Sequence, residues 1–309
     1  MGDELHRVID HYCGQPVLTD DDLPTLFKAA DREAEKAQRR LVVLTAALLA
    51  LAVVSAIFGS FSIEHAGKDW AAVGSLVSLA GGLGASYLLS QWNPNKHWYD
   101  FRALAESSKS LTWLYAVGGG DFGIDARSEQ EARTDFLGRL GDLRQQLAPD
   151  TPAVTSDPVA ITDRMRQLRS TTLDERRDAY RSGRLHQQLT WYRGRAGEHS
   201  RARTFWGWLT FALQSAGFSF AFLRLFEILH VDLVGIATTA AVSAAAWLRS
   251  HDHAGVAEAY SQTTLELGEI EPTVNDPATE AEWATWVASA ETAMSREHTS
   301  WRARRRRLV

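Results

Sequence analysis

The chain of 309 residues has one cysteine, Cys13, so no intrachain disulfide can form. Charged residues interrupt the first 15 positions and leave no apolar core there, so we expect no cleaved signal peptide. No segment has the pattern of a β-sheet, and the long apolar stretches contain no aspartate or glutamate. That last absence excludes a ring of carboxylates inside a membrane as a means of holding cations.

Four uncharged apolar stretches form two close pairs: Leu41–Phe61 with Ala71–Leu89, and Phe205–Leu223 with Leu233–Leu248. A helix needs roughly 20 apolar residues to cross about 30 Å of hydrocarbon, and the first three stretches reach that length. The fourth is shorter and needs help from interfacial residues. The connectors are too short to fold alone, so each pair predicts a helical hairpin. The alternative is a large soluble helical protein, but the strongly polar remainder cannot supply the thick shell that four core helices need.

Basic residues precede each hairpin. Five lie in Lys28–Arg40 before the first stretch, and four lie in Arg193–Arg203 before the third. The connectors within the hairpins have few, and acids offset them. Because lysine and arginine are retained in the cytosol, we expect both termini and the segment 91–204 to be cytosolic. The predicted fold is an all-α integral membrane protein with four transmembrane helices in two hairpins and a cytosolic helical bundle.

The two halves follow one plan, in which a charged helix leads into two spans and a long helix returns. Pro94 predicts a break after the second span, and Gly118–Gly120 predict the end of the helix that follows. Ser128 with Glu131, and Thr172 with Glu175, predict helix starts of the capping-box type. The predicted division is residues 1–23 as an N-terminal segment, 24–148 as a first two-span module, 149–160 as a linker, and 161–309 as a second two-span module with a basic tail.

The third stretch carries a polar line at helical spacing, and phenylalanines adjoin it. Gln214 at membrane depth should face protein or water, and Arg224 near the outer mouth would favour anions over cations. Alternatively, the Gln214 amide hydrogen-bonds to a neighbouring helix, and the long Arg224 side chain places its charge at the membrane–water interface. The candidate pore-lining residues are Thr210, Gln214, Gly217, Phe218, Ala221 and Arg224, and the candidate gate is Phe218 with Phe222.

Small residues at four-residue spacing mark one face of the second stretch, where they let helix backbones approach closely. They predict helix packing rather than pore lining, and they are Gly74, Ser78, Gly81 and Ala85.

Arginines with interleaved aromatics dominate residues 163–203, a combination suited to phosphates and stacked bases. Most of these arginines are better explained by pairing with the acidic helices of Glu258–Glu297. The candidate ligand-binding residues are Arg176, Arg177, Tyr180, Arg184, Trp191, Arg193 and Arg195.

Catalytic and metal-binding patterns are weak. His251 and His253 flank Asp252 without a further ligand, so we expect no metal site. Gly118–Gly123 follows a helix rather than a strand, which is the wrong context for a phosphate-binding loop. We therefore expect no enzyme activity and no cofactor.

Several segments resemble known two-span modules called SLATT domains. Ala29–Asp31, Gln38–Arg40, Phe101–Ser107 and Leu111–Tyr115 resemble one subtype. A second subtype is resembled by Arg184–Gln188, Trp191–Tyr192 and Trp286–Trp301. A tandem SLATT chain of this size is similar to the Hailong-type effectors of bacterial anti-phage defence.

This resemblance implies a pore-forming effector in the bacterial inner (cytoplasmic) membrane, triggered by a phage-derived event and then depolarising the host. It also implies a homo-oligomer, with a tetramer favoured, and a partner nucleotidyltransferase that makes a single-stranded DNA oligomer or nucleotide signal. The competing interpretation is a membrane-anchored receptor or scaffold that binds the signal without conducting.

Overall fold

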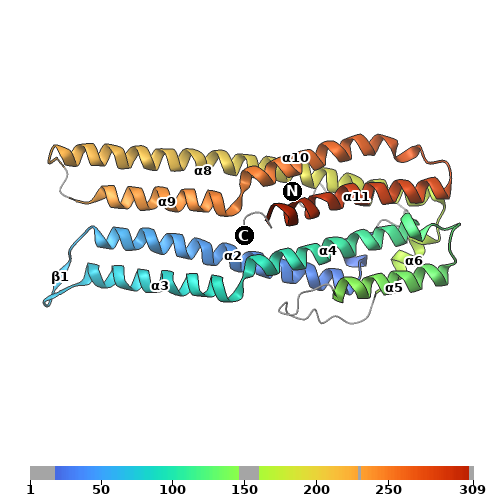
Figure 1. Ribbon diagram of the computed structural model, residues 1–309, viewed down its shortest axis with the longest axis horizontal. Helices are drawn as coiled ribbons and strands as arrows, with labels where there is room; N and C mark the ends of the chain where they lie inside the picture. The colour runs from blue at the N-terminus through green and yellow to red at the C-terminus, as the bar shows by residue number, and fades with distance from the viewer. Residues whose placement is uncertain (1–17, 146–159, 229–230, 306–309) are drawn as a thin grey trace. The chain divides into compact units, whose positions relative to one another are not determined.

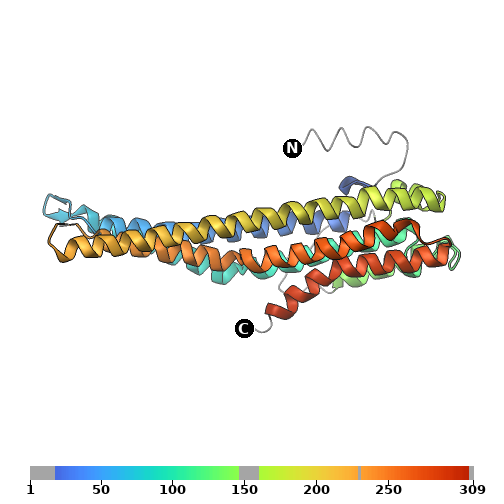
Figure 2. The same ribbon diagram turned by 90° about the horizontal axis from the view of Figure 1, so that it is seen from above.

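The computed structural model describes residues 18–145, 160–228 and 231–305, with side chains described as far as Ser295. This part of the chain is built from long helices, drawn in Figures 1 and 2. The α-helices are α2 (Thr25–Gly59), α3 (Trp70–Trp92), α4 (Pro94–Val117), α5 (Glu129–Gln145), α6 (Asp163–Arg169), α7 (Leu173–Tyr180), α8 (Gln187–Leu225), α9 (Leu233–His251), α10 (His253–Ile270) and α11 (Glu280–Arg305). Short 3₁₀ turns are η1 (Asp20–Asp22), η2 (Gly120–Phe122) and η4 (Glu271–Asn275), and η3 (Arg181–His186) is a π-helix.

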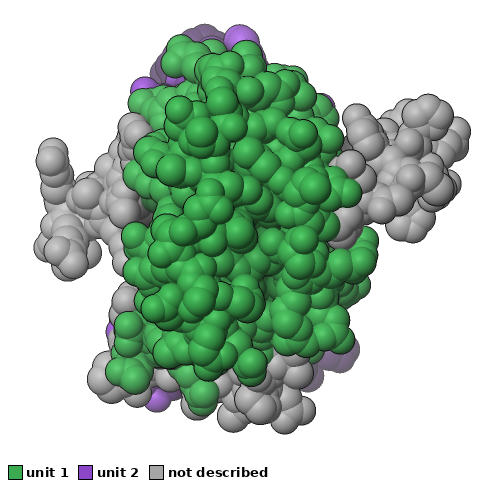
Figure 3. Space-filling view, turned by 90° about the vertical axis from the view of Figure 1, so that its right-hand side faces the viewer, with its two compact units in different colours: residues 1–34, 99–194, 259–309 green, residues 35–98, 195–258 purple. Residues whose placement is uncertain are grey.

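The chain forms two compact units, coloured separately in Figure 3. Unit 1 comprises residues 1–34, 99–194 and 259–309, and unit 2 comprises residues 35–98 and 195–258. The predicted linker 149–160 lies almost wholly outside the described residues, as do Cys13 and the side chains of the basic tail.

Unit 2 contains sections of α2, α3, α8 and α9 that pack through small side chains. Between α2 and α3, the hydroxyls of Ser55 and Ser75 lie 2.8 Å apart. Ser60 Oγ, just after α2, donates to the carbonyl of Asp232, just before α9, over 3.0 Å. Large apolar side chains point away from this packing, as Leu83 (73% exposed) and Phe218 (76% exposed) show. Apolar surface turned outward is the pattern expected of helices that lie in lipid.

Within the described residues, three helical segments are long and apolar enough to cross a membrane: Thr25–Gly59, Trp70–Phe122 and Leu233–Asn275. They correspond to the first, second and fourth stretches of the sequence. The third stretch, in α8, is not among these candidate spans, because Trp206, Trp208 and Gln214 lower its mean hydropathy. The structure therefore confirms an almost wholly helical membrane protein with three candidate spans.

The core of unit 1 is aromatic and centres on Tyr180, which is fully buried. The rings of Trp113, Trp283 and Trp286 meet the Tyr180 ring edge-on, with centroids 5.8, 5.9 and 6.0 Å away. Edge-to-face pairs of this kind add to the free energy gained by burying apolar area. They hold α4, α7 and α11 together.

Local signals in the sequence place most helix ends correctly. Asn93, in the left-handed region at φ 38°, separates α3 from α4, directly before Pro94. The capping box of Thr172 and Glu175 is present at the start of α7. Two features were not predicted: the π-helix η3, and a two-stranded ladder of β1 (Glu64–His65) and β2 (Lys68–Asp69) at the tip of the first hairpin. The expectation of no β-structure is wrong for these four residues because the short turn through Ala66 and Gly67 forces the chain back on itself.

The turn after α4 yields a stability prediction. A Cβ on Gly119 would lie 2.5 Å from Cγ1 of Val287 on α11, so Gly119→Ala should lower the free energy of unfolding by about 1–3 kcal/mol through overpacking. Gly138→Ala is the matched control, since nothing lies within 4 Å of that position in α5. We expect it to be neutral or stabilising by up to about 1 kcal/mol. Chemical unfolding of the purified chain, followed by tryptophan fluorescence, measures both, and equal effects would contradict the packing argument.

Candidate functional site

The small-residue face of α3 lies against α2. A Cβ on Gly74 would come within 2.9 Å of the Phe58 ring, and one on Gly81 within 3.0 Å of Leu51. Ser78 and Ala85 are also buried, and Ser78 Oγ donates to the Gly74 carbonyl over 2.8 Å. Of the four positions predicted for helix packing, Gly74 and Gly81 thus lie close to side chains of α2, and Ser78 and Ala85 are buried.

Some candidate pore residues of α8 have contacts within the protomer, and others lie at its surface. Gly217 is buried against α9, where an added Cβ would lie 3.6 Å from Ala237. Arg224 pairs with Asp232 over 3.0 Å, and Thr210 bonds the carbonyl of Trp206 within its own helix. The remaining members are exposed in the protomer, as is Arg224: Gln214, Phe218, Ala221 and Phe222. The exposed members form the part of this face that remains available to a pore or to a neighbouring subunit.

Arg176 is 1% exposed and joins three segments of unit 1. Its Nη1 donates to the Val117 carbonyl over 2.9 Å, and its Nε donates to the Thr171 carbonyl over 3.2 Å. Its Nη2 pairs with Glu280 at the start of α11. The Val117 carbonyl also accepts from the Trp283 indole over 2.8 Å. One carbonyl at the C-terminal end of α4, where helical partners are lacking, is therefore satisfied twice.

Arg184 is also 1% exposed and forms a two-pronged pair with Glu291 of α11. Its Nε and Nη2 lie 2.9 and 2.8 Å from the two carboxylate oxygens, and the Tyr180 hydroxyl donates to the same carboxylate over 2.9 Å. Burial alone would lower the pKa of the Arg184 guanidinium, but the charge and hydrogen bonds of Glu291, with smaller contributions from Glu106 and Tyr180, together outweigh burial and raise the pKa. Burial, followed by the Glu291 charge, raises the pKa of Tyr180 well above its ordinary value. The pair is therefore charged, with a neutral phenol beside it, at any pH near neutrality.

The other predicted ligand residues lie nearer to solvent. Arg177 bonds Asp174 and the carbonyl of Pro277. Trp191, Arg193 and Arg195 are exposed, and Arg195 pairs with Glu198 over 2.8 Å. The predicted set therefore divides into a buried group that joins helices and an exposed group that a ligand could reach.

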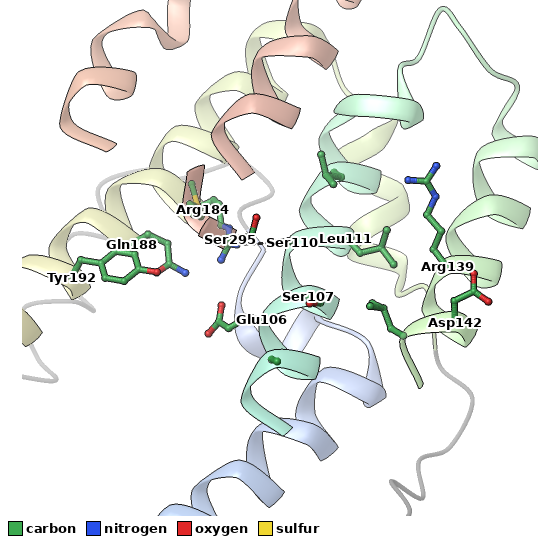
Figure 4. Close-up of a pocket in the computed structure, with 14 residues that line it drawn as sticks. Glu106, Ser107, Ser110, Leu111, Arg139, Asp142, Arg184, Gln188, Tyr192 and Ser295 are labelled. Atoms are coloured by element: carbon green, nitrogen blue, oxygen red, sulfur yellow. Dashed lines mark hydrogen bonds between the residues drawn. The ribbon is translucent and has the colours of Figure 1, made fainter. Parts of the chain in front are cut away.

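Two cavities of about 440 and 260 Å³ lie beside Arg184. Both are bordered by Glu106, Arg184 and Gln188. Figure 4 shows Glu106 and Ser107 on α4 facing the same space as Arg184 and Gln188 in the larger cavity. Glu106, Ser107 and Gln188 belong to the SLATT-like segments Phe101–Ser107 and Arg184–Gln188, but no pattern in the sequence placed them beside one cavity.

Three histidines meet near the junction of α9 and α10. The Nδ1 atoms of His199 and His253 are 2.9 Å apart, and the rings of His251 and His253 stack at 5.5 Å. Within the residues described, no group of three or more side chains is placed to hold a metal ion.

Comparisons with known proteins identify the family. Residues 24–177 match the SMODS and SLOG-associating 2TM effector domain 3, and residues 180–301 match the SMODS and SLOG-associating 2TM effector domain 1. The comparisons with curated proteins and with solved structures gave no match. Domains of this family are associated with conflict systems as membrane effectors. The chain therefore belongs to the SLATT family and carries two of its domains in tandem.

Proposed function

We propose that this protein is a homo-oligomeric, pore-forming effector of bacterial anti-phage defence that depolarises the host membrane in response to a nucleotide or oligonucleotide signal. It crosses the inner membrane four times, with α8 as the third span, and keeps both termini and a helical bundle in the cytosol. A tetramer is the favoured assembly. The trigger is phage-derived, and a partner nucleotidyltransferase supplies the signal.

The surface of α8 carries this proposal. Its apolar section exposes Phe218 and Phe222 together with the amide of Gln214. An amide in hydrocarbon is costly unless it meets protein or water. The Gln214 amide is too polar for lipid, and the phenylalanine rings beside it are too apolar for bulk water. An oligomer in which the Gln214 face lines a pore accommodates both.

A non-conducting receptor or scaffold is the second candidate. The observation in its favour is the exposed group of Trp191, Arg193 and Arg195, which offers an aromatic ring and two cations to a ligand. In that case, substitutions that abolish signalling would map to this surface, and the apolar section of α8 from Phe205 to Leu225 would tolerate substitution.

Ion flux from proteoliposomes that contain the purified chain tests the proposal, with and without short single-stranded DNA. We expect flux in one of the two conditions. Absence of flux in both, with correctly inserted protein, would favour the receptor.

Reversal potentials test the role of Arg224. In asymmetric chloride we expect the potential to follow the chloride equilibrium, provided that the Arg224 side chains leave their exposed pairs with Asp232 and so concentrate positive potential at the outer mouth. Arg224→Ala should shift the reversal potential toward zero, whereas Lys68→Ala in the first hairpin loop should leave it unchanged. Reversal at the cation equilibrium would show that another helix lines the pore, with the Gly74 face of α3 as the next candidate.

A further inference from the structure

An apolar groove of about 370 Å³ lies between α2, α8 and α9 in unit 2. The residues that line it fall within 46–53 of α2, 206–213 of α8 and 240–247 of α9. Each of these segments rises about 10 Å along its helix, so three helices bound the groove over about two turns each. An elongated space of this kind suits a chain-like occupant.

The lining of the groove is small and apolar. Four of its residues are alanines, whose methyl groups fill little of the space between the helices: Ala46, Ala50, Ala240 and Ala244. The polar side-chain groups in the lining are two indole N–H groups and the hydroxyl of Ser243, which lies 3.5 Å from the carbonyl of Leu49. A buried water takes roughly two to four polar partners, so this lining favours hydrocarbon over water.

The groove begins at a pair of tryptophans and extends into a membrane-spanning section. Trp206 and Trp247 lie at the same end of it, with ring centroids 5.7 Å apart. Tryptophan is enriched where the membrane meets water, and α2 and α9 belong to segments able to cross a membrane. From the interface, a groove of about 10 Å stays within the roughly 15 Å of hydrocarbon in one leaflet. That is the depth at which a lipid places its acyl chain.

The groove also lies away from the candidate pore face of α8. Leu209 lines the groove, and Phe218 is the candidate gate. At about 100° per residue these two positions are on opposite sides of the helix. An oligomer that turns Phe218 toward a central pore therefore turns the groove toward the surrounding lipid rather than into the ion path.

Positive charge gathers beyond the tryptophan end of the groove. Within seven residues of that end, the three helices carry five exposed arginines and one aspartate: Arg39, Arg40, Arg201, Arg203, Arg249 and Asp252. None of these arginines forms an ion pair with another described residue. A basic cluster at the membrane surface attracts anionic headgroups, whichever of its arginines makes the contact.

We infer that the groove holds one acyl chain of an anionic phospholipid, with the phosphate of the headgroup among the arginines at the tryptophan end. The topology proposed above assigns this lipid to the cytosolic leaflet. The site itself goes beyond the proposed function, because the groove and its arginines do not depend on ion conduction.

Photo-crosslinking of the full chain in phosphatidylcholine vesicles tests the inference. The probes are phosphatidylglycerol and phosphatidylcholine, each with a diazirine on one acyl chain, and mass spectrometry locates the adducts. We expect phosphatidylglycerol to label the groove segments of α2 and α9 more strongly than the exposed face of α3 at Leu76 and Leu83. Equal labelling of groove and α3 would show ordinary surrounding lipid only, and equal labelling of the groove by both probes would refute a preference for anionic lipid.

A substitution that fills the groove locates the acyl chain. Ala50 lines the groove from an exposed position, so Ala50→Phe adds bulk there without overpacking a buried site and should abolish the preferential labelling of α9. Ala245→Phe, at an exposed position of α9 outside the lining, should leave the labelling unchanged. Undiminished labelling in Ala50→Phe would overturn the assignment. So would a photoreactive side chain in place of Ala50 that joins two copies of the chain, since the groove would then be a subunit contact.

A double substitution tests the headgroup. Arg203→Gln with Arg249→Gln should lower the preference for phosphatidylglycerol on the order of tenfold, because each surface arginine adds to the attraction of anionic lipid. Arg133→Gln with Arg144→Gln, two exposed arginines of α5, is the matched control and should not change it. An unchanged preference in the first pair would refute the role of these arginines. A chain that holds the lipid without conducting would refute the pore proposal and leave this site standing.

Discussion

Glu291→Ala is expected to destabilise the protein by about 3–5 kcal/mol, the usual cost of removing one partner of a buried ion pair. The carboxylate is 4% exposed on its side chain and accepts from both Arg184 and Tyr180. Removing it leaves a guanidinium and a phenol buried without a strong acceptor, and neither can recover its hydration without opening the bundle. Chemical unfolding of the full chain in mild detergent, followed by tryptophan fluorescence, measures the loss.

Two comparisons make this result specific. Glu198→Ala breaks an exposed pair with Arg195 and should cost less than about 1 kcal/mol. The double variant Arg184→Met with Glu291→Leu removes both charges together and should recover much of the loss, since apolar residues of similar volume often replace a buried pair without cost. A Glu291→Ala variant as stable as the wild type would show that the bundle does not depend on this contact.

Phe218→Asn is expected to raise resting ion flux on the order of tenfold or more, if hydrophobic dewetting of the pore sets the closed state. The phenylalanine is 76% exposed in the protomer and therefore has room to face a pore formed by several subunits. A polar amide at that constriction would hold water and carry ions in the absence of a trigger. Flux from proteoliposomes at zero signal measures the effect.

Leu83→Asn on α3 is the matched control, because Leu83 is 73% exposed and lies opposite the small-residue face. It should leave resting flux unchanged. Equal resting flux in the two variants would indicate a general loss of membrane packing. A Phe218→Asn channel with no increase in resting flux would show that Phe218 is not part of the gate.

Local signals in the sequence were enough to place the helices and their ends. Pro94 predicted the break that the structure places at Asn93, and Thr172 with Glu175 predicted the start of α7. These signals act over at most four residues, through backbone groups that a neighbouring side chain either satisfies or blocks. The hydropathy of the first, second and fourth stretches likewise predicted three segments that can cross a membrane.

Pairing between distant segments could not be predicted in the same way. The distribution of charges along the sequence favoured pairing with the acidic helices for most of the arginines, and Arg176 and Arg184 do pair with Glu280 and Glu291. It could not say which arginine meets which acid, because Arg184 and Glu291 are 107 residues apart and many charges of both signs compete. The π-helix that sets the position of Arg184 also has no sequence signature beyond Gly183.

The sequence by itself thus determined a helical membrane chain of two modules, because periodicity, caps and hydropathy are local properties. Only the tertiary structure decided which polar groups are used in packing and which remain available. It buried Gly217 against α9 while leaving Gln214 exposed, and it enclosed Arg184 in a pair with Glu291 while leaving Arg193 at the surface. Those outcomes depend on how helix faces meet, and residues that share a helical face in the sequence can meet different neighbours once the helices pack.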